Sequence, residues 1–290
     1  MRALILSAVV FAPSAAFAHT GGGTDESGWT FAPWLTAPLA VSALLWSTGF
    51  LRRLRRSHSG KPFLWREAGW FALAWLILAL AVLSPLHAAG ERSFTMHMIE
   101  HEIIMMIAAP LFALARPLPT MLWGFAQPWR AWYGSVAAYT APFWRAVTAP
   151  VFATIAQAAA LWLWHAPSLF NLALASDFWH AAQHLSFFVT ALIFWAAMLD
   201  ARHPIGVRAL CLFATSIVGG ALGALMAVSE SPWYGPYALL GMTPQGLTSA
   251  EDQQLAGLLM WVPGGFVHAG AALMLLAPFL RADQSARRSP

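Results

Sequence analysis

The sequence predicts an all-α protein, a polytopic integral membrane bundle of helices, and three observations support this fold class. Of the 290 residues, 59% are hydrophobic and only 10% are charged, against about a quarter charged in ordinary soluble domains. The mean hydropathy is +0.61. The apolar residues gather in runs near the length of about 20 residues that crosses a bilayer as a helix. Together these observations exclude a water-soluble globule and an intrinsically disordered chain.

The first residues, 1–18, have the pattern of a cleaved signal peptide. Arg2 supplies the positive charge, Ala3 to Phe11 the apolar core, and Ala16-Phe17-Ala18 the small-residue cleavage site. Residues 19–290 then form a single transmembrane domain. The mature chain is expected to begin at His19, outside the cytoplasm.

Seven spans follow in order, at 33–51, 66–84, 95–115, 147–165, 178–199, 206–228 and 254–280. They are predicted as helices because lipid forces each segment to satisfy its own backbone polar groups. The motif Trp261-Val262-Pro263-Gly264-Gly265 is expected to break or bend the last span. The connection 116–146, rich in Pro and Trp, is expected at the membrane interface. The loop 229–252 is expected to cap the outer face.

The basic residues predict the orientation. With the N-terminus outside, fourteen Lys and Arg fall on the inner side and only Arg92 stays outside, as the positive-inside tendency requires. The C-terminus is therefore expected in the cytoplasm. The net charge of +4 reflects this topology. The basic stretch Arg52 to Arg56 has no aromatic stacking platform beside it, so no nucleic-acid partner is expected; the bilayer is the expected surrounding.

The ten histidines are not scattered. Two pairs are spaced four residues apart near the outer starts of two spans, and His165 ends a third span on the same side. Spacing of four places two imidazoles on one helix face, where both can reach one metal ion. Seven histidines lie outside or in the outer part of a span: His19, His87, His97, His101, His165, His180 and His184.

These histidines, with neighbouring acidic and thioether groups, form a predicted metal site. A structural polar network is the competing interpretation. One cysteine excludes a disulfide framework and a Cys-built metal module. Imidazole with thioether favours copper, particularly Cu(I), and zinc is the alternative. The part played by His19 or His268 stays open. The candidate ligands are His97, His101, His165, His180, His184, Met98, Glu100 and Asp177.

Three stretches resemble the signature of the CtaG-type cytochrome c oxidase assembly factors (caa-type oxidase assembly, integral membrane). They are Met96-His97-Met98-Ile99-Glu100-His101 through Pro110, Trp164 to Phe170 with His180 to His184, and Met260 to Gly265. The sequence departs from the family pattern at two positions. Glu102 stands where the family commonly has methionine, and Gln183 stands where it often has an acidic residue.

The resemblance implies a bacterial inner-membrane protein that serves as a chaperone in cytochrome c oxidase assembly. It implies copper binding or delivery near the periplasmic face, with no enzymatic activity. The implied partners are oxidase subunits or another copper chaperone.

Two other functions fit the same residues. One is a seven-span zinc-dependent membrane hydrolase with Glu100 or Asp177 as general base, although the sequence has no HExxH motif. The other is a haem b electron carrier with one axial histidine from each of two spans, for instance His97 and His180. Transport is a weaker alternative, because only Pro263-Gly264-Gly265 strongly interrupts a span and no inverted repeat is visible.

Overall fold

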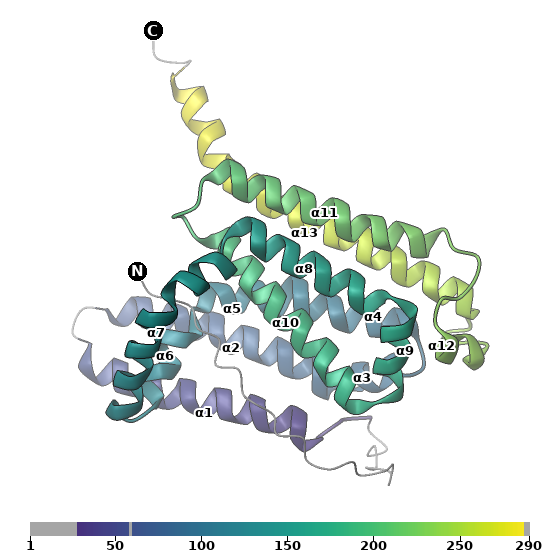
Figure 1. Cartoon of the computed structure of the whole chain (residues 1–290), viewed down its shortest axis with the longest axis horizontal. Helices are drawn as coiled ribbons and strands as arrows, with labels where there is room; N and C mark the ends of the chain where they lie inside the picture. The colour runs from purple at the N-terminus through teal and green to yellow at the C-terminus, as the bar shows by residue number, and fades with distance from the viewer. Residues whose placement is uncertain (1–27, 58–59, 287–290) are drawn as a thin grey trace.

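The fold is an all-α membrane bundle, seen in a computed structural model that describes residues 28–57 and 60–286 (Figure 1). Within these residues there is no strand, only an isolated bridge between Met242 and Thr248. The all-α prediction is therefore confirmed. The predicted signal peptide 1–18 and His19 lie outside the described residues.

Most of the helices begin with a proline in their first turn, where the missing N–H would have no intrahelical partner. The helices are α1 (Pro33–Arg56), α2 (Lys61–Leu83), α3 (Pro85–Gly90), α4 (Phe94–Glu102), the π-helix η1 (Ile103–Ala108), α5 (Ala109–Ala115), α6 (Pro117–Gly124), α7 (Gln127–Val147), α8 (Pro150–His165), α9 (Pro167–Ala175), α10 (Asp177–Leu199), α11 (Ile205–Ala227), α12 (Gly235–Leu240) and α13 (Ser249–Ala286).

The predicted spans match these helices closely. Six candidate spans are long and apolar enough to cross a membrane: α1, α2, α4 to α5 as one unit, α10, α11 and α13. The predicted span 147–165 corresponds to α8, which has only 16 residues. It joins α7 at a bend of 71°, and the count reaches seven only if this bent pair is taken as one span.

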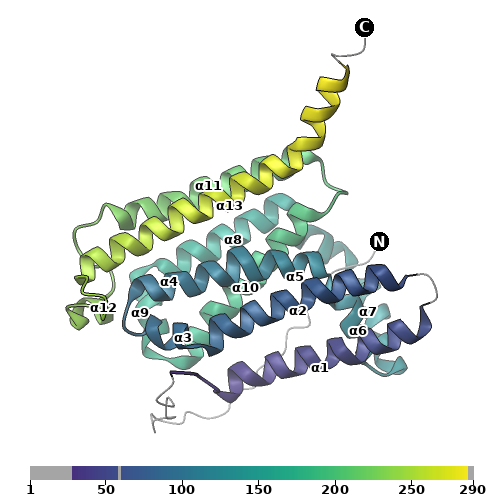
Figure 2. The same ribbon diagram turned by 180° about the vertical axis from the view of Figure 1, so that it is seen from behind.

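The long helices run side by side, and the short ones gather at the two ends (Figures 1 and 2). Helices α3, α9 and α12 close one end, called the cluster end below because the histidines lie there. Helices α6 and α7 lie at the opposite end. Helix α7 has no buried residue, so its interfacial location stays a prediction.

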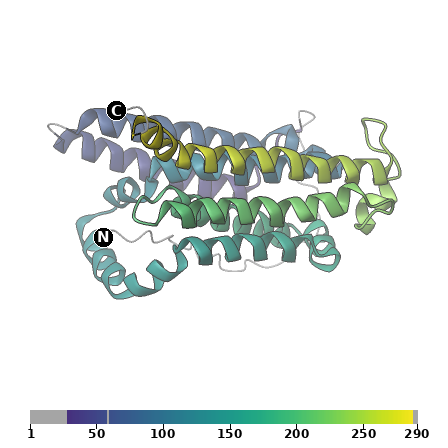
Figure 3. The same cartoon turned by 90° about the horizontal axis from the view of Figure 1, so that it is seen from above.

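Helices α11 and α13 lie side by side along one flank of the bundle (Figure 3). Glycines allow their close approach, since a Cβ at Gly223 would lie 2.6 Å from the carbonyl oxygen of Gly257. The indole of Trp261 covers Gly220 in the same way, at 2.9 Å from a Cβ placed there. Such small-residue contacts let dispersion forces hold helices together in lipid, where the hydrophobic effect does not.

The expected break in the last span is absent, because α13 continues through Pro263, Gly264 and Gly265. The visible bend of α13 lies nearer its C-terminal end (Figure 2). Pro263 is exposed, and of the two glycines Gly264 faces Glu102 of α4 while Gly265 faces Ser216 of α11. Membrane helices tolerate such a proline when local adjustment or neighbouring groups satisfy the freed carbonyl.

The π-helix η1 follows directly after Glu102, the last residue of α4, and has a local cause. Pro110 has no N–H to donate to the carbonyl of Met106, which disrupts regular α-helical bonding before it. The N–H of Ala109 bonds instead to the carbonyl of Ile104, five residues back. The carbonyl of Met105 is thereby released, and the indole Nε1 of Trp195 donates to it at 2.9 Å.

We expect Gly223→Ala to lower the stability of the bundle by about 1–3 kcal/mol, because the new methyl group must push α13 away. Gly219→Ala is the matched control on the same helix, since its Cβ would meet only Leu161 at an ordinary 3.6 Å. Thermal unfolding in detergent measures both. Equal stabilities for the two variants would contradict the close packing.

Candidate metal centre

The start of α4, which carries the first histidine pair, is fixed by a carboxylate from α13. Asp252 is buried and accepts hydrogen bonds from the Ser93 hydroxyl at 2.8 Å and from the backbone N–H of Phe94 at 2.6 Å. It also accepts from the N–H of Thr95 at 3.1 Å. An acceptor at a helix N-terminus satisfies donors that have no intrahelical partner. Asp252 therefore sets the position from which His97 and His101 project.

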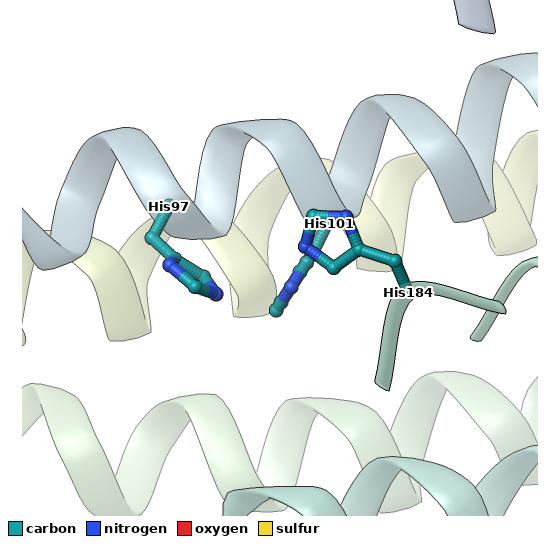
Figure 4. A group of neighbouring side chains, drawn as sticks. All are labelled: His97, His101 and His184. Carbon is teal, nitrogen blue, oxygen red and sulfur yellow. The ribbon is translucent and has the colours of Figure 1, made fainter. Parts of the chain in front are cut away.

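Three histidines from two helices form the centre of the site. His97 and His101 project from α4 and His184 from α10 toward the same space (Figure 4). One ring nitrogen from each lies within 4.8 Å of the others, and all three side chains are buried. This arrangement is compatible with one metal ion held by three imidazoles.

A second group shares His184 and adds a carboxylate. His87 on α3, Glu100 and His184 also place one ligand atom each within 4.8 Å of one another. The Nδ1 of His87 lies 2.9 Å from Oε1 and 3.2 Å from Oε2 of Glu100. The Nδ1 of His184 lies 3.6 Å from Glu100 Oε1. Two overlapping groups of donors therefore lie side by side.

His87 sits between two spans, on α3, where burial alone would lower its pKa. The hydrogen bond to Glu100 and the charge of that carboxylate outweigh burial, so the pKa of His87 is raised. His87 is thus held as the partner of Glu100.

His180 packs among these rings. Its ring stacks nearly parallel on the rings of His87 and His97, with a centroid distance of 5.2 Å to each. The centroid of the His184 ring lies 4.4 Å away. Asp177, at the start of α10, belongs to neither group of potential metal ligands found in the described part of the chain. We refer to His87, His97, Glu100, His101, His180 and His184 as the histidine cluster.

Tyr237 on α12 sets the protonation of His97. Burial raises the pKa of the Tyr237 phenol well above its usual value, so the hydroxyl keeps its proton. That proton goes to the carbonyl of Gly90 at 2.6 Å. The same oxygen lies 3.1 Å from Nδ1 of His97 and can only accept there. His97 therefore carries its proton on Nδ1, and Nε2 keeps a free lone pair for a metal.

His165 and Met98 lie next to the cluster with soft donor atoms facing each other. The Nδ1 of His165 donates to the carbonyl of Leu161 at 2.7 Å, which leaves the lone pair on Nε2. That Nε2 lies 3.4 Å from the sulfur of Met98. The ring of His165 is 6.4 Å from that of His101. Two lone pairs facing each other are compatible with a metal ion shared between them.

The structure thus brings together seven of the eight predicted site residues, and it adds three that sequence reasoning did not assign to the site. His87 was placed on the same side of the membrane but not among the ligands. Its link to Glu100 depends on tertiary contact. Tyr237 and Asp252 belong to the segment 229–252, from which Tyr237 contacts His97 and Asp252 contacts the start of α4. No sequence spacing marks either residue, although Tyr237 stands in a loop expected to cap this face.

Comparison with known proteins gives one finding. A family model described as cytochrome c oxidase caa3 assembly factor matches residues 45–282. No curated protein and no solved structure shows a significant match to the chain.

We expect Tyr237→Phe to weaken metal binding by about 10- to 100-fold, because the acceptor that fixes the proton of His97 is lost. Tyr234→Phe is the matched control. Tyr234 is also buried, but its hydroxyl donates to the backbone carbonyl of His165 at 3.0 Å and contacts no imidazole. Tyr237→Phe removes two buried hydrogen bonds and Tyr234→Phe removes one, so Tyr237→Phe is expected to cost somewhat more stability, and the comparison rests on metal affinity. A competition assay with a chromophoric chelator measures the affinities, and equal affinities would contradict the role of Tyr237.

Proposed function

The chain belongs to the cytochrome c oxidase caa3 assembly factor family, and we propose that in this role it binds Cu(I) at the histidine cluster and delivers it to a haem–copper oxidase. The family points to assembly and to a non-catalytic role. Copper is the cargo in this proposal, and the cluster is the place where it is held before transfer.

The observation that carries the proposal is a set of buried imidazole nitrogens without partners. In the described part of the chain, the Nε2 atoms of His97, His101 and His184 have no hydrogen-bond partner. An unsatisfied buried polar atom costs about 1–3 kcal/mol, and the cost rises in lipid. A metal ion would bind these lone pairs and offset the cost.

Copper(I) fits this donor set better than a hard cation does. The donors are imidazoles, and the adjacent Met98 sulfur adds a thioether, which hard cations do not prefer. Cys211, the only cysteine, is buried elsewhere in the core. The cluster holds more donors than one ion needs, which favours release by exchange of one ligand for another.

The contacts argue against the two alternative functions. The rings of His97 and His180 stack at 5.2 Å, so no macrocycle fits between them as a bis-histidine haem site requires. In a zinc hydrolase Glu100 would be free to act as general base, yet both its oxygens lie within 3.2 Å of His87.

We further propose that the protein is a multi-pass protein of the bacterial inner membrane with a periplasmic N-terminus and a cytoplasmic C-terminus. Support comes from the distribution of side chains along the bundle. The histidines lie on α3, at the start of α4 and α10 and at the end of α8, whereas basic residues such as Arg53 and Arg56 end α1 at the other side of the bundle. Oxidase subunits or another copper chaperone would then meet the cluster end.

The first test uses the triple variant His97→Ala/His101→Ala/His184→Ala of the full chain in detergent. We expect it to lose at least one equivalent of Cu(I) relative to the wild type in an equilibrium competition titration. His203→Ala, in the loop between α10 and α11, is the control and should bind as the wild type does. Unchanged copper content in the triple variant would sink the proposal, and stoichiometric zinc instead of copper would favour the hydrolase.

The second test is made in cells that lack the native protein. We expect His101→Ala to give oxidase that contains haem but is depleted in copper and inactive, since His101 has two unpartnered ring nitrogens in the cluster. His203→Ala should restore activity fully. Copper and haem analysis of the purified oxidase, with an immunoblot for equal protein levels, decides the matter. Full activity with His101→Ala would contradict delivery through the cluster.

A further inference from the structure

A second group of soft donors lies deeper in the bundle, outside the histidine cluster. Helices η1, α8, α11 and α13 surround a cavity of ≈ 30 Å³, which exceeds the space needed for a single water molecule. Among its lining residues are Glu102, Met105, Met106, Gln157 and His268. Ionisable groups inside a span mark functional sites by default.

Two side chains of the cavity have buried polar atoms without partners. His268 is 3% exposed, and its Nδ1 donates to the carbonyl of Gly264 at 2.8 Å, which leaves the lone pair on Nε2. That Nε2 and the Oε1 of Gln157 have no hydrogen-bond partner in the described residues. No hydrogen bond or ion pair from the Glu102 carboxyl is found there either. The cavity therefore offers an imidazole, an amide oxygen and a carboxyl to a ligand.

The π-helix supplies the sulfur atoms. Met105 and Met106 are neighbours in η1, and both line the cavity. The amide nitrogen of Gln157 donates to the Met105 sulfur at 3.3 Å, which holds that thioether toward α8. Single π-helical turns within α-helices occur often at functional sites. Here the turn lies beside the cavity and one turn beyond His101.

We propose that this cavity is a second Cu(I) site, held by Met105, Met106, His268 and Glu102. The proposal rests on the proposed function, because it assigns the same cargo to a second place. Thioether and imidazole together select Cu(I) over hard cations. One carboxylate cancels the charge of Cu(I), whereas a divalent ion would leave an uncompensated charge in a medium of low dielectric constant.

The spacing of residues along two segments shows that this site lies close to the cluster. His101 and Met105 are four residues apart, as are Leu161 and His165. Leu161 accepts the hydrogen bond of His165 and also lines the cavity. The cavity is thus within about two helical turns, or ~11 Å, of the cluster. Cu(I) moves between the sites by ligand exchange: a Cu–N bond to the cluster breaks as Cu–S bonds to the methionines form, with no change of oxidation state.

The test is an equilibrium Cu(I) titration of the full chain with two sets of variants. The wild type should bind two equivalents. The triple variant His97→Ala/His101→Ala/His184→Ala should keep one equivalent, and copper X-ray absorption should show sulfur among the ligands of that ion. The variant Met105→Leu/Met106→Leu/His268→Phe should also keep one equivalent, bound at the histidine cluster, because it has lost the donors of the cavity. It is chosen to fold, since leucine matches methionine in volume and phenylalanine keeps the ring that stacks on Trp195 at 5.6 Å.

Two further variants complete the test. Ser216→Ala, which lines the cavity without a soft donor, should still bind two equivalents. Glu102→Gln keeps the shape of the side chain and should weaken the second equivalent at least tenfold.

Each result discriminates between the two sites. The second site is overturned if the cavity variant still binds two equivalents, or if the cluster variant binds none. If the cluster variant instead binds as much as the wild type while the cavity variant loses copper, the cavity site stands and the proposed cluster site fails.

Discussion

The need of every buried polar atom for a partner governs the arrangement around α4. The carboxylate of Asp252 satisfies the backbone at the start of this helix, and the hydroxyl of Tyr237 satisfies Nδ1 of His97. Beside these contacts, the Nε2 atoms of His97, His101 and His184 have no hydrogen-bond partner among the described residues. Asp252 thereby holds the histidine pair of α4 in place, and Tyr237 prepares His97 as a ligand, because a fixed proton on Nδ1 leaves Nε2 free for a metal.

Residues that are poor helix formers in water provide the geometry on which this depends. Pro110 causes the π-helix that follows His101. Gly90 lets α3 approach α4, since a Cβ there would lie 3.3 Å from Cα of His97. Gly223 and Gly257 let α11 and α13 pack closely, and α13 carries both Asp252 and His268. In lipid, close backbone contact is the main attraction between helices, so small residues position whole segments.

Much of the site was predictable because its signals are local. Spacing of four puts His97 with His101 and His180 with His184 on shared helix faces, and the structure brings the two pairs together across α4 and α10. His87 and Tyr237 have no such spacing, since each joins the cluster from a different short helix. The expected break at Pro263 is absent, because α13 continues through this residue as one helix although proline removes one backbone hydrogen bond.

The sequence by itself determined the all-α membrane fold, the number of spans to within one, and which histidines share a helix face. These properties follow from run length and from the helical repeat, both of which act within one segment. Tertiary structure alone decided which donors meet: Glu100 with His87, His165 with Met98, and His268 with the methionines of η1 around one cavity. Contacts between segments depend on how the helices pack against one another, and that packing is set by the whole bundle at once.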